Sequence, residues 1–180
     1  MYGKNYKAFT LVEMLVVMGI LVILMTMGIA AGRFAIQRAN RVQHTNAADQ
    51  LYQGLQSYYA DNREFPDATT FGDFDTALGT GGALEKYIDS KAFDGGSDAT
   101  YYYSVEDPAG QSVLVCVSYG GPQDENGQGG YCNGNGFGSL PSGTSVQKKE
   151  LDDSEFATQV EDNGGFVIRN DWNAADRVWE

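Results

Sequence analysis

The pattern of apolar and polar positions divides the chain into three parts, of which the first is almost entirely apolar. From Phe9 to Ala31 there are 23 residues, and only Thr10, Glu13 and Thr26 are clearly polar. A helix of that length rises about 35 Å, which is enough to cross a bilayer core of about 30 Å. Lys4 and Lys7 precede the run, which favours an N-terminus that stays in the cytoplasm. The pattern predicts a membrane-spanning helix that delivers the rest of the chain to the outside.

After Arg33 the pattern becomes amphipathic. Apolar and aromatic residues recur at spacings of three and four, which predicts one buried face of a helix; they are Ala48, Leu51, Tyr52, Leu55, Tyr58 and Tyr59. The pattern runs to Ala60 and ends in "DNREFPD", where Asn and Pro are stop signals. We therefore expect one continuous helix over residues 9–60. The only histidine, His44, falls on a polar stretch and is expected to be exposed.

Beyond Pro66 the chain is rich in turns, and three stretches predict strands. "TYYYSV" (100–105) and "SVLVCVSY" (112–119) are β-branched and aromatic, with a Pro and Gly turn between them, and "GFVIRN" (165–170) is similar. "GALEKYI" (82–88) predicts a short helix, and the glycine-rich stretch 120–143 predicts a loop. The predicted fold class is α+β, with a small antiparallel sheet laid against the amphipathic half of a long helix.

Charge is distributed unevenly. Residues 1–60 contain five Lys or Arg and two acids, a balance of +3. Since the net charge of the whole chain is −12, residues 61–180 carry −15. Such an acidic body repels polyanions. Direct DNA binding by most of the surface is therefore disfavoured, because neutralising phosphates requires clustered Lys and Arg.

Motifs of catalysis are missing from the sequence. It has no GxSxG elbow, no P-loop and no HExxH, and its carboxylates sit in turns with no second feature that pairs two of them as acid and base. We expect a protein that is not an enzyme and needs no cofactor.

The two cysteines, Cys116 and Cys132, are sixteen positions apart and have no CxxC or nearby His, which argues against a zinc site. If this part is exported, a disulfide is the natural interpretation and would stabilise the fold by about 3 kcal/mol on the chain-entropy model. Two reduced thiols are the alternative.

Glu13 separates three interpretations of the apolar run. A secretory signal peptide has a shorter apolar region, of about 7–15 residues, and an acid at its start is unusual. A simple anchor accounts for everything except Glu13, because a carboxylate in a membrane segment is costly and points to a function. The third interpretation gives that carboxylate a partner.

"KAFTLVEML" resembles the processing site of type IV pilins and pseudopilins, and "LQSYYADNREFPD" is similar to the helix exit of major pseudopilins. The resemblance implies cleavage by a prepilin peptidase between Ala8 and Phe9, N-methylation of Phe9, and pairing of Glu13 with the terminal amine of a neighbouring subunit. Two departures are Ala8, where the family usually has glycine, and Gly28 with Gly32, where many members have a proline.

By this resemblance the chain consists of a leader (1–8), a transmembrane and polymerisation helix (9–32), an amphipathic second half of the helix (33–65) and an acidic pilin body (66–180). The expected function is that of a structural subunit, a homo-oligomer in a type IV pilus-like filament used for adhesion, motility, DNA uptake or secretion. Its implied partners are a prepilin peptidase, an inner-membrane platform protein and an assembly ATPase.

The precursor would lie in the cytoplasmic membrane, and the assembled form would be an extracellular pilus or a periplasmic or cell-wall pseudopilus. A membrane-tethered extracytoplasmic binding domain that never polymerises is the alternative.

Calcium is a further candidate ligand. Asp124, Glu125 and Asn126 in "GPQDENGQGG" offer oxygen atoms, and major pseudopilins bind calcium in a C-terminal loop. The segment fails the EF-hand spacing, and an acidic glycine-rich turn is most often only solvated, so we assign no metal.

Overall fold

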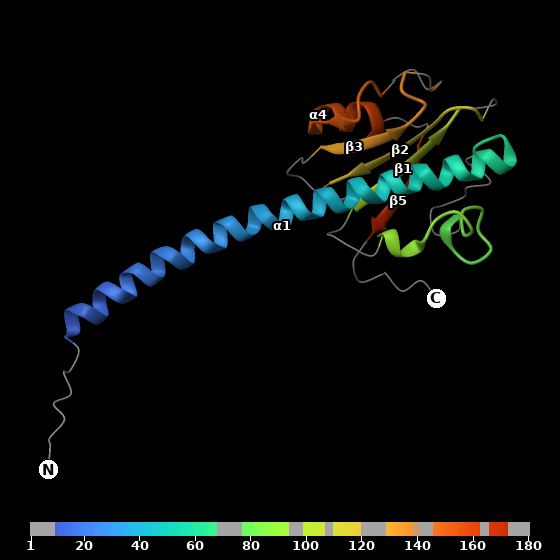
Figure 1. Cartoon of the computed structure of the whole chain (residues 1–180). Helices are drawn as coiled ribbons and strands as arrows, with labels where there is room; N and C mark the ends of the chain where they lie inside the picture. The colour runs from blue at the N-terminus through green and yellow to red at the C-terminus, as the bar shows by residue number, and fades with distance from the viewer. Residues whose placement is uncertain are drawn as a thin grey trace, which may run out of the picture. The chain divides into compact units, whose positions relative to one another are not determined.

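The computed structural model describes residues 10–67, 77–93, 99–106, 110–119, 129–138, 140, 146–162 and 166–172. The chain forms two compact units, Met1–Arg38 and Ala39–Glu180. Helix α1, Leu11–Asn62, begins in the first unit and ends in the second (Figure 1).

Helix α1 runs for 52 residues without interruption, as the sequence predicted, and continues through Gly28 and Gly32. It ends two residues later than expected. Arg63 takes the left-handed conformation, with φ of 64°, and its N–H donates to the Tyr59 carbonyl at 2.7 Å. A left-handed residue that donates its N–H to a carbonyl of the last turn is a common way for a helix to end.

The second unit contains one five-stranded sheet in the order β4-β3-β2-β1-β5. The strands are β1 (Ala99–Val105), β2 (Val113–Ser118), β3 (Gly130–Gly134), β4 (Glu150–Leu151) and β5 (Val167–Trp172). All neighbouring strands are antiparallel. The α+β class is therefore confirmed, and β1, β2 and β5 lie within two residues of the strands that the sequence predicted.

Two predictions for this unit were wrong. The glycine-rich stretch 120–143 was predicted to be a loop, but it contains strand β3. Two of its glycines lie in this strand at positions where a side chain has no room. A Cβ on Gly130 would lie 2.2 Å from the Phe156 ring, and one on Gly134 would lie 2.0 Å from the Val113 carbonyl oxygen. "GALEKYI" forms turns rather than a helix, since Ile88 N–H bonds to Leu84 O but the pattern does not continue.

One face of the sheet packs on the second half of α1. Ala47, Ala48, Leu51 and Leu55 share a buried cluster with Tyr101, Tyr103, Val113, Val115 and Val117. The amphipathic pattern predicted this face, with one error. His44 is 2% exposed, because it lies four residues before Ala48 on the same face, and its Nδ1 is 3.3 Å from the Tyr101 hydroxyl.

The other face of the sheet is covered by α4 (Asp153–Phe156) and the π-helix η2 (Ala157–Glu161). Phe156 and Val160 pack there in a second cluster with Tyr102, Leu114 and both cysteines. Asp152 caps α4 by accepting from the Glu155 N–H at 3.0 Å, while the Glu155 carboxylate accepts from the Asp152 N–H at 3.0 Å. This reciprocal pair of hydrogen bonds is a capping box. It fixes the start of α4 and so the direction from which Phe156 packs on the sheet.

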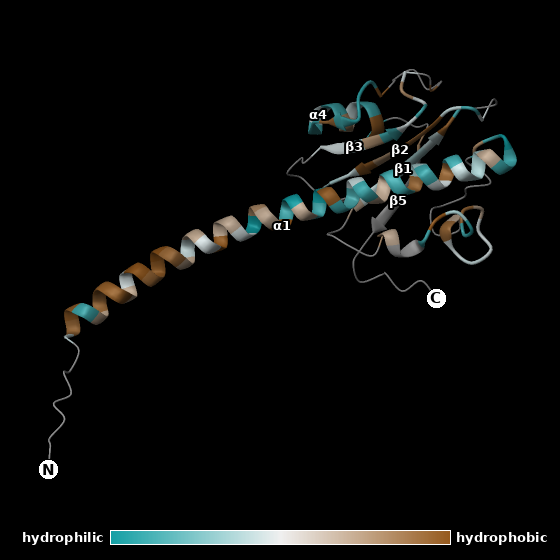
Figure 2. Ribbon diagram, in the orientation of Figure 1, coloured by the Kyte–Doolittle hydropathy of each residue, from teal (hydrophilic) through white to brown (hydrophobic). Residues whose placement is uncertain are grey.

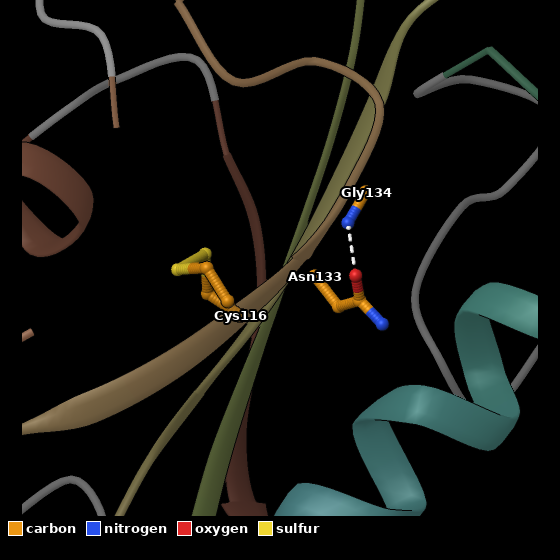
Figure 3. Close-up of a disulfide and its surroundings, with 4 residues drawn as sticks. Cys116, Asn133 and Gly134 are labelled. Carbon is orange, nitrogen blue, oxygen red and sulfur yellow. Dashed lines mark hydrogen bonds between the residues drawn. A yellow bond between two sulfur atoms is a disulfide. The ribbon is translucent and has the colours of Figure 1, made fainter. Parts of the chain in front are cut away.

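Cys116 and Cys132 are joined by a disulfide and lie directly opposite each other in β2 and β3. The Cys132 N–H donates to the Lys149 carbonyl, away from β2, so the cysteines occupy a non-hydrogen-bonded pair, where side chains come closest. Figure 3 shows the disulfide on one side of the sheet and Asn133 on the side of α1.

A polar contact ties α1 to β3 on that side. The Asp49 carboxylate accepts from the Asn133 amide at 2.6 Å and from the Tyr131 hydroxyl at 2.8 Å. Burial, and then the hydrogen bond to Asp49, raises the pKa of Tyr131 above its ordinary value of 10.0. The hydroxyl is protonated at neutral pH, as tyrosine ordinarily is, and the raised pKa extends its donor role to higher pH.

Candidate functional site: the exposed apolar half of the long helix

The first half of α1 exposes an unusually apolar surface. Every residue from Thr10 to Ala31 is exposed, Leu11 to 80% and Met25 to 69%. Figure 2 shows the hydrophobic colour dominating this part of α1 and mixing with hydrophilic residues further along. Contiguous exposed apolar surface of this extent marks a membrane or protein contact. α1 is the one helix in the described part of the chain that is long and apolar enough to cross a membrane.

Glu13 closes the first turn of this helix. Its Oε2 accepts from the Thr10 N–H at 2.9 Å and from the Thr10 hydroxyl at 2.9 Å, and the Glu13 N–H lies 3.3 Å from the same hydroxyl. Thr10 and Glu13 thus form a capping box, which satisfies backbone donors that the helix cannot. The Thr-x-x-Glu spacing signals this capping role, which is separate from the assembly role expected of Glu13.

Thr26, the third polar residue of the run, is also satisfied locally. Its hydroxyl donates to the Ile23 carbonyl at 2.8 Å. Back-bonding of this kind removes the need for water or a partner side chain. The helix can therefore lie in an apolar medium without an exposed unsatisfied donor at this position.

Several predicted site residues lie outside the described residues: Ala8 and Phe9 at the expected cleavage site, and Asp124, Glu125 and Asn126 of the calcium hypothesis. Over the ranges that the structure does describe, no group of three or more His, Cys, Asp or Glu side chains could hold a metal ion. Glu13 and the disulfide belong to different units and serve different parts of the chain.

A long N-terminal helix with an exposed apolar half, followed by a small antiparallel sheet, defines an α+β arrangement consistent with a pilin-like fold. The model of the prokaryotic N-terminal methylation motif, the class III signal of type IV pilins, matches residues 3–29. This match supports a type IV pilin-like or pseudopilin-like protein. The match does not extend into the body. No curated protein and no solved structure matches the chain.

Proposed function

We propose that this protein is the structural subunit of a type IV pilus-like filament. It is cut between Ala8 and Phe9 by a prepilin peptidase, methylated on Phe9, and polymerised through α1 by a platform protein and a cytoplasmic ATPase. The observation that carries the proposal is the match of the methylation motif to residues 3–29, of which residues 11–29 form an exposed apolar helix. The proposed role is mechanical, since the motif favours a structural rather than a catalytic protein.

Assembly exchanges lipid contacts for helix contacts. Lipid tails are as apolar as the helix, so removing the helix from the bilayer brings little hydrophobic gain, and packing and polar contacts must drive association. Gly28 and Gly32 support close packing, because they lie four residues apart on one face of α1 and carry no side chain that would keep a neighbouring helix away.

Glu13 provides the polar contact. Cleavage before Phe9 creates an α-amine four residues from Glu13, about one helical turn away. The carboxylate already holds the Thr10 N–H within its own chain, and one oxygen, Oε2, makes both bonds. The other oxygen is then available to the terminal amine of a neighbouring subunit. Either charge left without the other in an apolar filament core would disfavour docking.

Glutamine separates the two roles of Glu13, because it keeps a capping oxygen and loses the charge. We expect Glu13→Gln to leave the helix start intact and to reduce sheared surface filaments at least about tenfold. Thr10→Val is the matched control, since it weakens the cap and keeps the charge. Circular dichroism in detergent micelles reports the helix, and electron microscopy reports filaments.

Normal filament numbers in Glu13→Gln would contradict the charge role. If the wild-type protein stays in membranes without filaments, the chain is the tethered binding domain that the sequence also allows, and the proposed function is wrong.

A further inference from the structure

The segment of α1 that follows the apolar run is basic. No acid occurs between Glu13 and Asp49, whereas Arg33, Arg38 and Arg41 do. Arg33 and Arg38 are exposed, and neither forms an ion pair with any residue that the structure describes. Exposed apolar side chains lie beside them: Phe34 is 75% exposed and Ile36 is 62% exposed.

Arg41 differs from these two arginines, because its own subunit already engages it. Its guanidinium carbon lies 5.0 Å from the centre of the Tyr119 ring. That distance is within the range of a cation–π contact. Arg33 and Arg38 are therefore the basic groups on this part of α1 for which the described structure provides no such contact.

The body carries a matching acidic block. Residues 150–162 contain six acids and no Lys or Arg. Three of the six are used locally, since Glu155 pairs with Lys148 at 2.7 Å, Asp152 caps α4 and Glu161 accepts from the Tyr102 hydroxyl at 3.3 Å. Glu150, Asp153 and Asp162 are exposed. This block belongs to the layer that covers the sheet face opposite α1.

We propose that Arg33 and Arg38 of one subunit bind the exposed carboxylates of residues 150–162 of a second copy of this chain, with Phe34 covered in the same contact. The inference rests on the proposed function. It adds a contact between subunits that lies outside the packed apolar helices of the filament. The two surfaces lie on different parts of the chain, and a heterologous contact between them that does not close into a ring produces an open filament when it is repeated. Complementary charge also fixes the register of docking and suppresses wrong partners.

Anionic lipid headgroups are the competing ligand. Residues 11–32 rise about 33 Å as a helix, which places Arg33 near the membrane surface if the run spans the bilayer. The second copy is favoured because the chain itself supplies the acidic partner in every subunit, and because the −15 body is repelled by the same headgroups.

Charge reversal tests the contact. We expect Arg33→Asp with Arg38→Asp to reduce sheared filaments at least about tenfold, while the precursor remains in the membrane fraction. Adding Glu150→Lys and Asp162→Lys should restore filaments, because the pairs are then reversed. Arg41→Gln is the matched control, since it removes one nearby positive charge that acts within the subunit, and it should keep most filaments.

Cross-linking tests proximity directly, because the two native cysteines are bonded to each other. Arg38→Cys is combined in turn with Glu150→Cys, Asp153→Cys and Asp162→Cys, and oxidised filaments are separated without reductant. A ladder of covalent multimers from at least one pair supports the contact. Glu85→Cys, an exposed acid outside the block, serves as the negative control.

Wild-type filaments together with normal filaments of the reversed arginine variant would overturn this inference and leave the proposed function standing. Loss of the arginine variant from membranes, without rescue by the lysine changes, would assign the arginines to lipid and would also overturn it. Absence of filaments from the wild type would instead refute the proposed function.

Discussion

Arg63 occupies a left-handed conformation that glycine adopts at lower cost, since a Cβ is crowded there. We expect Arg63→Gly to raise the free energy of unfolding by about 0.5–1 kcal/mol, after allowing for the greater freedom of glycine in the unfolded chain. Chemical denaturation of the full chain in detergent micelles measures it. Arg63→Ala is the control and should bring no such gain; equal effects of the two variants would contradict the explanation.

The roles of single residues were predictable from the sequence only where a regular spacing of residues indicates them. The buried face of α1 followed from spacings of three and four, but His44 was assigned to solvent because its residue type outweighed its position. Its place four residues before Ala48 was the better guide, and the Tyr101 hydroxyl lies near enough to accommodate a polar ring. The Thr10 and Glu13 cap was readable as Thr-x-x-Glu and was overlooked beside the assembly role.

At the scale of elements, Gly54 determines how closely α1 approaches the turn at Ile88. A Cβ on Gly54 would lie 2.1 Å from Ile88 Cγ1 and 3.2 Å from the Tyr87 carbonyl oxygen. We expect Gly54→Ala to destabilise the body, because overpacking costs about 1–3 kcal/mol and exceeds the gain in helix propensity of about 1 kcal/mol.

The effect of Gly54→Ala on stability should disappear or change sign when the Ile88 side chain is shortened. In an Ile88→Ala background, Gly54→Ala should be neutral or stabilising, and thermal unfolding of the four proteins gives the coupling. Gly54→Ala that stabilises the wild type would show that the helix and the turn separate easily.

The disulfide joins two neighbouring strands and also anchors a chain segment rich in glycine. Removing it with Cys116→Ala and Cys132→Ala should lower the free energy of unfolding by about 3 kcal/mol, as expected for a loop of this length. The wild-type protein measured with and without a reductant is the matched comparison. Equal stability of the oxidised and reduced protein would contradict this stabilising role.

Elements with their own periodicity were predictable, and elements defined by neighbours were not. The β-branched and aromatic runs of β1 and β2 are sufficient to predict these strands. Strand β3, "GYCNG", has little strand propensity, and it forms because it pairs with β2 along five positions and Gly130 admits the Phe156 ring. Such a strand is specified by tertiary contacts, which a single sequence does not display.

For the whole molecule, the two units separate two tasks. The first exposes an apolar helix that carries the methylation motif, and the second buries two clusters on opposite faces of one sheet. The class was predictable because the motif is local and ordered in sequence. The use of the proposed filament was not predictable, because it depends on the surface of the body, where no sequence motif was found.

The most direct measurement is N-terminal sequencing with intact mass of the protein recovered from sheared cell-surface filaments. The account predicts a chain that begins at Phe9 and carries one added methyl group. A chain that begins near Ala31 would mean an ordinary secreted domain, and one that begins at Met1 and remains in membranes would mean a tether. Either result would contradict the filament function and the role given to Glu13.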